Sequence, residues 1–138
     1  MREYKPIIDS VDRAFLVKGY VDGRPQYDPD PPYWLELKIK PDPKFCGESE
    51  IFTQKSVIEK LIEELKLLDK RNKGHCGIKC VGWGSYINFT ITNPGDLTIS
   101  GQINKRWNEE DIYLKFKFTS DSSAISRLIA VLGELITN

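Results

Sequence analysis

The spacing of the hydrophobic residues constrains this fold most, because it switches between two periods along the chain. In the segment YWLELKIK (33–40), apolar and polar residues alternate, which is the period of a strand with one buried face. Over residues 56–70, apolar residues recur every three or four positions, which predicts an amphipathic helix. The same helical spacing returns over residues 121–136. Strand and helix patterns in one chain of this length predict a single α+β domain, residues 1–138.

Further strands are predicted where β-forming residues cluster between turn signals. They cover residues 14–21, 50–53, 77–82, 85–92, 96–104 and 111–118. The sequence Asn93-Pro94-Gly95-Asp96 is typical of a type II turn, and such short connections favour antiparallel pairing. The sequence shows no internal repeat. We therefore expect an antiparallel sheet of about five to seven strands, with both helices packed on one face.

Polar residues at the helix starts supply capping signals. Ser56 and Glu59 stand three positions apart, as in a capping box, in which each side chain bonds a free backbone N–H. Ser120, Asp121 or Ser122 can cap the second helix in a similar way. These signals predict that both helices begin close to the ends of strands.

If both helices cover one face of the sheet, its other face is open. That face is expected to be polar with aromatic residues in it, including Trp34, Tyr86 and Tyr113. Large aromatic side chains are enriched at protein interfaces and their hot spots. They also form ordinary cross-strand pairs on half-wet sheets, and this second interpretation stays open.

The charge balance argues against nucleic acid as a partner. Lys plus Arg and Asp plus Glu both number 20, so the formal net charge is zero, whereas nucleic-acid binders usually carry a basic excess. The N-terminal half has an acidic excess and the C-terminal half a basic one, which suits mild electrostatic steering. No secretory leader or membrane-length apolar run is visible, so we expect a cytoplasmic protein that binds no membrane.

Three soft ligands, His75, Cys76 and Cys80, lie within six residues, and Cys46 stands apart. A structural zinc site usually needs two ordered ligand pairs, so this spacing predicts no metal and no other cofactor. Adjacent residues in a loop usually point apart, so His75 and Cys76 are not expected to act as base and nucleophile. The expectation is small, reduced thiols.

Catalytic signals are sparse. Carboxylates cluster at Asp28 and Asp30 in a proline-rich segment, and at Glu109, Glu110 and Asp111 before the last strand. Such positions usually hold solvated charges, and no phosphate-binding or hydrolase motif occurs. The sequence therefore predicts a binding protein rather than an enzyme. A small hydrolase or transferase that uses these acids remains an alternative, as does an adaptor subunit of a larger assembly.

From about residue 14 onward, the chain resembles the WapI-family immunity proteins, which are bacterial cytoplasmic proteins encoded beside polymorphic or contact-dependent toxins. The resemblance lies in YWLELKIK, IFTQKSVIEKLIEEL, DLTISGQI and above all the ending IYLKFKFTSDSSAISRLIAVLGEL. It implies an antitoxin that binds a co-encoded toxin domain stoichiometrically. Separately, we expect a monomer or a weak homodimer, because a sheet edge could pair with a second copy. The family supplies no catalytic or conserved binding residue to transfer.

We place the expected toxin-binding surface on the open sheet face and the loops beside it. Trp34, Tyr86 and Tyr113 are the expected anchors, because a few large, rigid aromatics usually dominate an interface. The expected charged rim lies on two segments and consists of Tyr27, Asp28, Asp30, Trp107, Glu109 and Glu110.

Overall fold

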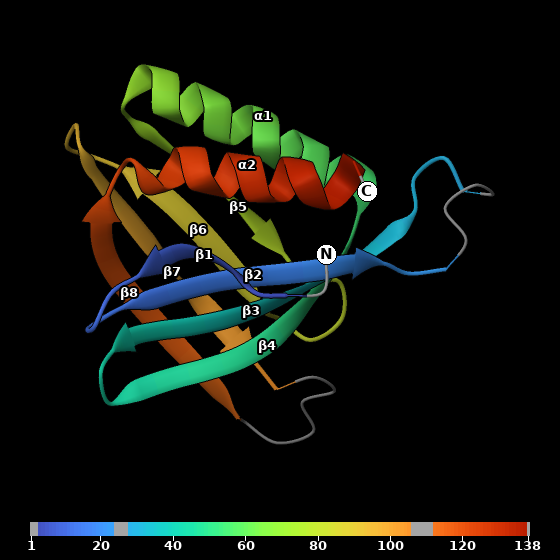
Figure 1. Cartoon of the computed structure of the whole chain (residues 1–138), viewed down its shortest axis with the longest axis horizontal. Coiled ribbons are helices and arrows are strands. Elements are labelled where there is room, and N and C mark those ends of the chain that lie inside the picture. The colour runs from blue at the N-terminus through green and yellow to red at the C-terminus, as the bar shows by residue number, and fades with distance from the viewer. Residues whose placement is uncertain (1–2, 24–27, 106–111, 138) are drawn as a thin grey trace.

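The computed structural model describes residues 3–23, 28–105 and 112–137, and Figure 1 shows their arrangement. The first half holds β1 (Lys5–Asp9), β2 (Ala14–Val21), β3 (Pro32–Asp42), β4 (Phe45–Gln54) and α1 (Lys55–Arg71). The second half holds β5 (Gly74–Lys79), β6 (Tyr86–Ile91), β7 (Asp96–Asn104), β8 (Tyr113–Asp121) and α2 (Ala124–Thr137). Neither helix in these ranges is long and apolar enough to span a lipid bilayer.

The strands form two antiparallel sheets of four strands each, where we had expected a single sheet of five to seven. Sheet A has the order β1-β2-β3-β4 and sheet B the order β5-β6-β7-β8, so every strand pairs with its neighbour in the sequence. The α+β class and the antiparallel pairing are confirmed. The number of sheets differs because α1 separates β4 from β5, and β5 then starts a new ladder with β6.

The element order ββββα occurs twice, although the sequence carries no visible repeat. The two helices lie side by side across one side of the molecule (Figure 1). Each packs largely on the sheet of the opposite half, because α1 contacts β5 and α2 contacts β1 and β2. Arg127 of α2 also bonds to the first half of the chain, since its Nε donates to the carbonyl of Ile7 at 2.7 Å.

One hydrophobic core lies between the sheets and the helices. The inner face of each strand contributes alternate residues, as the period of β3 illustrates, with Tyr33, Leu35, Leu37 and Ile39 all buried. Phe15 of sheet A and Phe89 of sheet B stack with ring centroids 6.2 Å apart. Because the inner faces meet in this way, the outer faces of the two sheets point away from each other.

Candidate protein-binding groove

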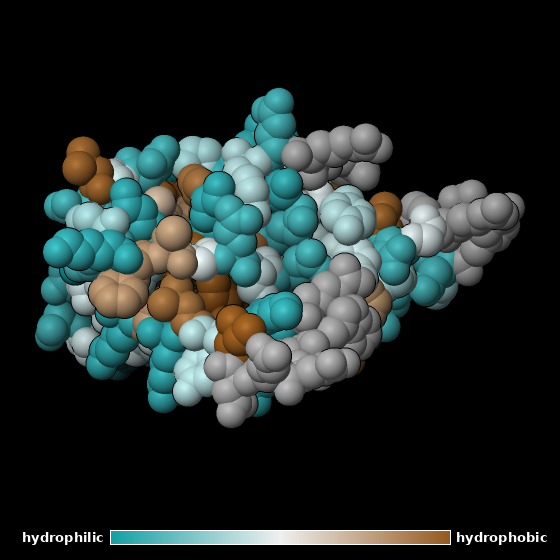
Figure 2. Space-filling view, turned by 90° about the horizontal axis from the view of Figure 1, so that it is seen from below, coloured by the Kyte–Doolittle hydropathy of each residue, from teal (hydrophilic) through white to brown (hydrophobic). Residues whose placement is uncertain are grey.

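A groove with a volume of about 540 Å³ lies where the edge of sheet A approaches sheet B. The sheets come close there, because Ser49 Oγ of β4 donates to the carbonyl of Asn104 at the end of β7. Gly47 allows this approach, since a Cβ at that position would lie only 3.0 Å from Cδ1 of Ile103. Figure 2 shows the hollow from below, with hydrophobic surface at its floor and hydrophilic atoms around it.

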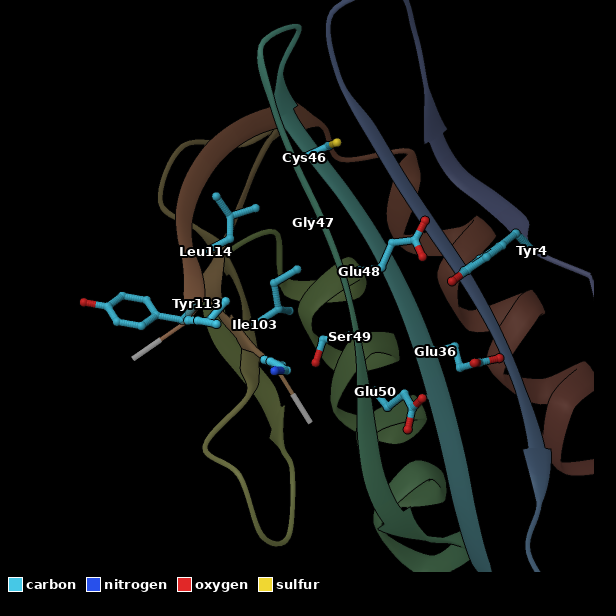
Figure 3. Close-up of a pocket in the computed structure, with 12 residues that line it drawn as sticks. Tyr4, Glu36, Cys46, Gly47, Glu48, Ser49, Glu50, Ile103, Tyr113 and Leu114 are labelled. Atoms are coloured by element: carbon cyan, nitrogen blue, oxygen red, sulfur yellow. The ribbon is translucent and has the colours of Figure 1, made fainter. Parts of the chain in front are cut away.

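The wall that sheet B contributes is apolar. It consists of Ile103, Ile112 and Leu114, with Lys105 at its end. Ile112 is 47% exposed, which is high for a large aliphatic side chain. In Figure 3 the side chains of Ile103 and Leu114 lie on the sheet B side of the groove.

The wall that sheet A contributes carries carboxylates. Glu36, Glu48 and Glu50 line it together with Tyr4, and Figure 3 shows the tyrosine ring near Glu36 and Glu48. Burial first, and then these three carboxylates, raise the pKa of the Tyr4 hydroxyl. The groups that this wall turns toward the groove are therefore carboxylates and a tyrosine hydroxyl.

Two lysines lie beside this wall and outside the groove lining. Lys18 Nζ is 3.4 Å from Glu36, and Lys38 Nζ is 3.1 Å from Glu48. Both ammonium groups also lie over the Tyr4 ring, 4.5 and 5.1 Å from its centroid. Cation–π and ion-pair contacts thus hold Tyr4 against sheet A.

The loop between β5 and β6 folds over one end of β4. The backbone N–H of Val81 donates to the carbonyl of Phe52 at 3.0 Å, and that of Phe52 donates to Cys80 Sγ at 3.3 Å. Trp83 Nε1 donates to the carbonyl of Glu50 at 2.8 Å. Hydrogen bonds therefore connect this end of β4 to the second half of the chain.

Trp34, an expected anchor, lies on the outer face of sheet A and belongs to an aromatic cluster. Its ring stacks on Trp83 at 5.8 Å and packs against Phe52 at 4.7 Å between centroids. Trp83 is only 7% exposed. The cluster packs the β5–β6 loop against sheet A, so Trp34 has a structural role.

The other two expected anchors, Tyr86 and Tyr113, lie on sheet B. Tyr86 of β6 is half-buried, and Tyr113 of β8 is 54% exposed. Tyr113 borders the groove, but its ring points away from the three glutamates (Figure 3). Since the outer faces of the two sheets point apart, Trp34 cannot share one flat surface with this pair. The three expected anchors are thus divided between two sheets, and their part in binding stays a prediction.

Asp28 and Asp30 shape the start of α1. The Asp28 carboxylate accepts from the N–H of Asp30 at 2.9 Å, and the Asp30 carboxylate accepts from the N–H and the hydroxyl of Ser56 at 2.7 Å each. The expected capping box is wrong, because α1 begins at Lys55 and Gln54 makes no side-chain cap bond. The rim residues Tyr27, Trp107, Glu109 and Glu110 lie outside the described residues.

Asp30 makes the stability of the protein depend on pH. The hydrogen bonds from the side chain and then the backbone of Ser56 lower the pKa of its carboxyl below 3.8. A lowered folded-state pKa means that the stabilisation is present above pH of about 4 and is lost as the pH falls through the folded-state value. We expect the free energy of unfolding of wild type to exceed that of Asp30→Asn at neutral pH, and this difference to shrink in acid.

Urea unfolding of both proteins at a series of pH values measures this difference. Ser56→Ala is the matched control, because it removes the hydroxyl donor and keeps the backbone donor. It should weaken the pH dependence without abolishing it. A difference that stays constant from neutral to acidic pH would contradict the assignment.

His75 and Cys76 are neighbours on β5, where His75 is exposed and Cys76 is buried. Cys76 is a core residue of β5, and burial followed by the nearby charge of Glu64 raises the pKa of its thiol to about 11. A thiol with such a pKa is a poor nucleophile at neutral pH. Burial is also the main cause that raises the pKa of the Cys80 thiol. In residues 3–23, 28–105 and 112–137, no three His, Cys, Asp or Glu side chains gather to hold a metal ion.

Sequence reasoning missed Tyr4 and Glu48, which line the groove, and Trp83, which bonds the carbonyl of Glu50. Glu48, Ser49 and Glu50 are consecutive polar residues, so period-2 alternation gave no signal for a strand longer than the predicted 50–53. Trp83 stands between Gly82 and Gly84, which have φ values of 126° and 80°. Glycines that allow positive φ on both sides of a tryptophan point to a loop that turns this side chain inward.

Comparisons with known proteins give no relative from which a role could be transferred. No family model matches the chain, and neither a curated protein nor a solved structure matches it.

Proposed function

We propose that this protein is an immunity protein that binds a co-encoded bacterial toxin domain in the producer's cytoplasm and neutralises it stoichiometrically. The groove between the sheets is the observation that carries the proposal. Its volume of about 540 Å³ and its apolar wall can take up projecting side chains of a protein partner, and its carboxylates can pair with basic groups. The resemblance to WapI-family immunity proteins supports the same role.

Two of the acids considered for an enzyme, Asp28 and Asp30, form hydrogen bonds at the start of α1. The proposal therefore contains no catalytic step. The docking site moves from the open sheet face expected from the sequence to the groove, where sheet A supplies charge and sheet B supplies apolar surface.

The test is co-expression with the protein encoded by the neighbouring gene. We expect rescue of growth from that protein's toxicity and a 1:1 complex on purification. Absence of both rescue and complex would contradict the immunity function.

Ile112→Asp tests whether the groove is the docking site. It places a charge on the apolar wall and should weaken the complex by about 2 kcal/mol, or roughly 30-fold, in calorimetric titrations. Leu67→Asp is a matched control, because Leu67 on α1 is also 47% exposed and lies outside the groove. Equal affinity of the two variants would show that the partner docks elsewhere.

A further inference from the structure

Alternate residues of β4 direct their backbone N–H and C=O groups away from β3, toward the edge of sheet A. Both backbone groups of Phe52 bond to the β5–β6 loop, so they point outward. In an antiparallel ladder this direction alternates, so the backbone groups of Glu50 and Glu48 also point outward. The pairing of β3 with β4 is regular from Pro32↔Gln54 to Ile39↔Gly47, so no bulge interrupts this alternation.

Within the described residues, these outward backbone groups have hydrogen-bond partners only toward the C-terminal end of β4. Phe52 is fully bonded, and the carbonyl of Glu50 accepts from Trp83. Glu48 comes next, and within the described residues its outward backbone groups make no hydrogen bond. Five consecutive residues, 46–50, line the groove. Since successive side chains of a strand point to opposite faces, such a run indicates that the groove follows the strand edge.

The groove also defines the side chains that an added strand would carry. A strand beside β4 continues the pleat of sheet A, so its side chains alternate between the two faces. On the outer face they would meet Glu48 and Tyr4, and on the inner face they would meet Ile103 and Leu114. The lining holds three carboxylates and one ammonium group, from Lys105, because Lys18 and Lys38, which pair with Glu36 and Glu48, lie outside it. The complementary sequence therefore alternates cationic and apolar residues.

We propose that the groove accepts an extended, basic segment of the partner protein as an additional strand on the free edge of β4. The added backbone bonds the outward groups of Glu48, its cationic side chains face Glu48 and Glu50, and its apolar side chains face Ile103 and Leu114. This inference rests on the proposed function and deepens it, because it gives the chemistry of the toxin segment that docks.

A synthetic peptide tests the docking mode without the toxin. The probe is a capped peptide of four Lys-Val repeats, added to isotope-labelled protein and followed by amide NMR and hydrogen exchange. We expect shifts centred on residues 46–50 and at least tenfold slower exchange of the Glu48 amide. A peptide of Glu-Val repeats should bind at least tenfold more weakly. A Lys-Val peptide that is N-methylated along one edge should lose binding, because it cannot donate to β4.

Two variants of Glu48 separate charge from backbone pairing. Glu48→Gln removes the carboxylate and keeps the N–H, whereas Glu48→Pro removes both at an edge position that does not bond β3. Binding of the Lys-Val peptide should weaken moderately in the first variant and at least tenfold further in the second. Their thermal melts confirm folding, and the N-methylated peptide gives the same answer with the wild-type protein if Glu48→Pro does not fold.

The outcomes distinguish the two proposals. Shifts that centre outside residues 46–50, or equal binding of the N-methylated peptide, would overturn strand addition. Immunity would still stand if the neighbouring gene product forms a complex sensitive to Ile112→Asp. Conversely, peptide binding at Glu48 without any complex or rescue would retain the strand site and remove the toxin as its partner.

Discussion

Replacing Phe89 by alanine should lower the free energy of unfolding by about 3–5 kcal/mol, a large fraction of the stability of a domain of this size. Phe89 is 2% exposed and stacks on Phe15 of the other sheet. The substitution removes apolar surface from the core and leaves a cavity between the sheets, where the surrounding strands are fixed by their ladders and cannot collapse into it. Urea unfolding at neutral pH measures the loss.

Tyr113→Ala is the control for Phe89→Ala. It removes an aromatic ring from the same sheet, but Tyr113 is 54% exposed. Its cost should stay below about 1 kcal/mol. Similar losses for both variants would mean that Phe89 does not join the two sheets as described.

Trp83→Ala should have an effect of similar size, about 3–5 kcal/mol, although Trp83 lies in a loop. The substitution removes a stacked ring that is 7% exposed, and it takes away the N–H that bonds the Glu50 carbonyl. The β5–β6 loop then loses its main attachment to sheet A. The free energy of unfolding from urea titration is again the measurement.

Two further variants separate the contributions to stability of the Trp83 ring packing, its hydrogen bond and its contact with Trp34. Trp83→Phe keeps most of the ring packing and loses the hydrogen bond, so it should cost only about 1–3 kcal/mol. Combining Trp83→Ala with Trp34→Ala should cost less than the two single losses added together, because the rings contact each other. Additive losses would mean that the two tryptophans act independently.

Local structure was largely predictable from the sequence, because it depends on hydrophobic period. The helices predicted over 56–70 and 121–136 correspond to α1 and α2, and the strand predicted over 96–104 coincides with β7. The short strand β1 was missed, since Lys5-Pro6-Ile7-Ile8-Asp9 contains a proline and too few alternations to stand out. β4 was predicted too short because Glu48, Ser49 and Glu50 are consecutive polar residues without alternation.

The arrangement of the strands was not predictable in the same way. Periodicity shows which face of a strand is buried, but both sheets bury an inner face, so one sheet and two sheets give the same pattern. Because of this ambiguity, we expected Trp34 to lie on one surface with Tyr86 and Tyr113. The groove depends on the contact of β4 with β7 across more than fifty residues of sequence, as between Ser49 and Asn104, and a local pattern cannot encode such a contact.

The exchange of helices between the halves has a consequence for how the chain folds as it leaves the ribosome. The helix that covers β1 and β2 is α2, which follows them by about 100 residues in the chain, and the bond from Arg127 to Ile7 joins residues 120 positions apart. Until translation reaches that helix, β1 and β2 lack this part of their cover. Contacts of such long range slow folding, and exposed strands are prone to aggregation. The nascent N-terminal half therefore exposes apolar surface that the folded chain buries.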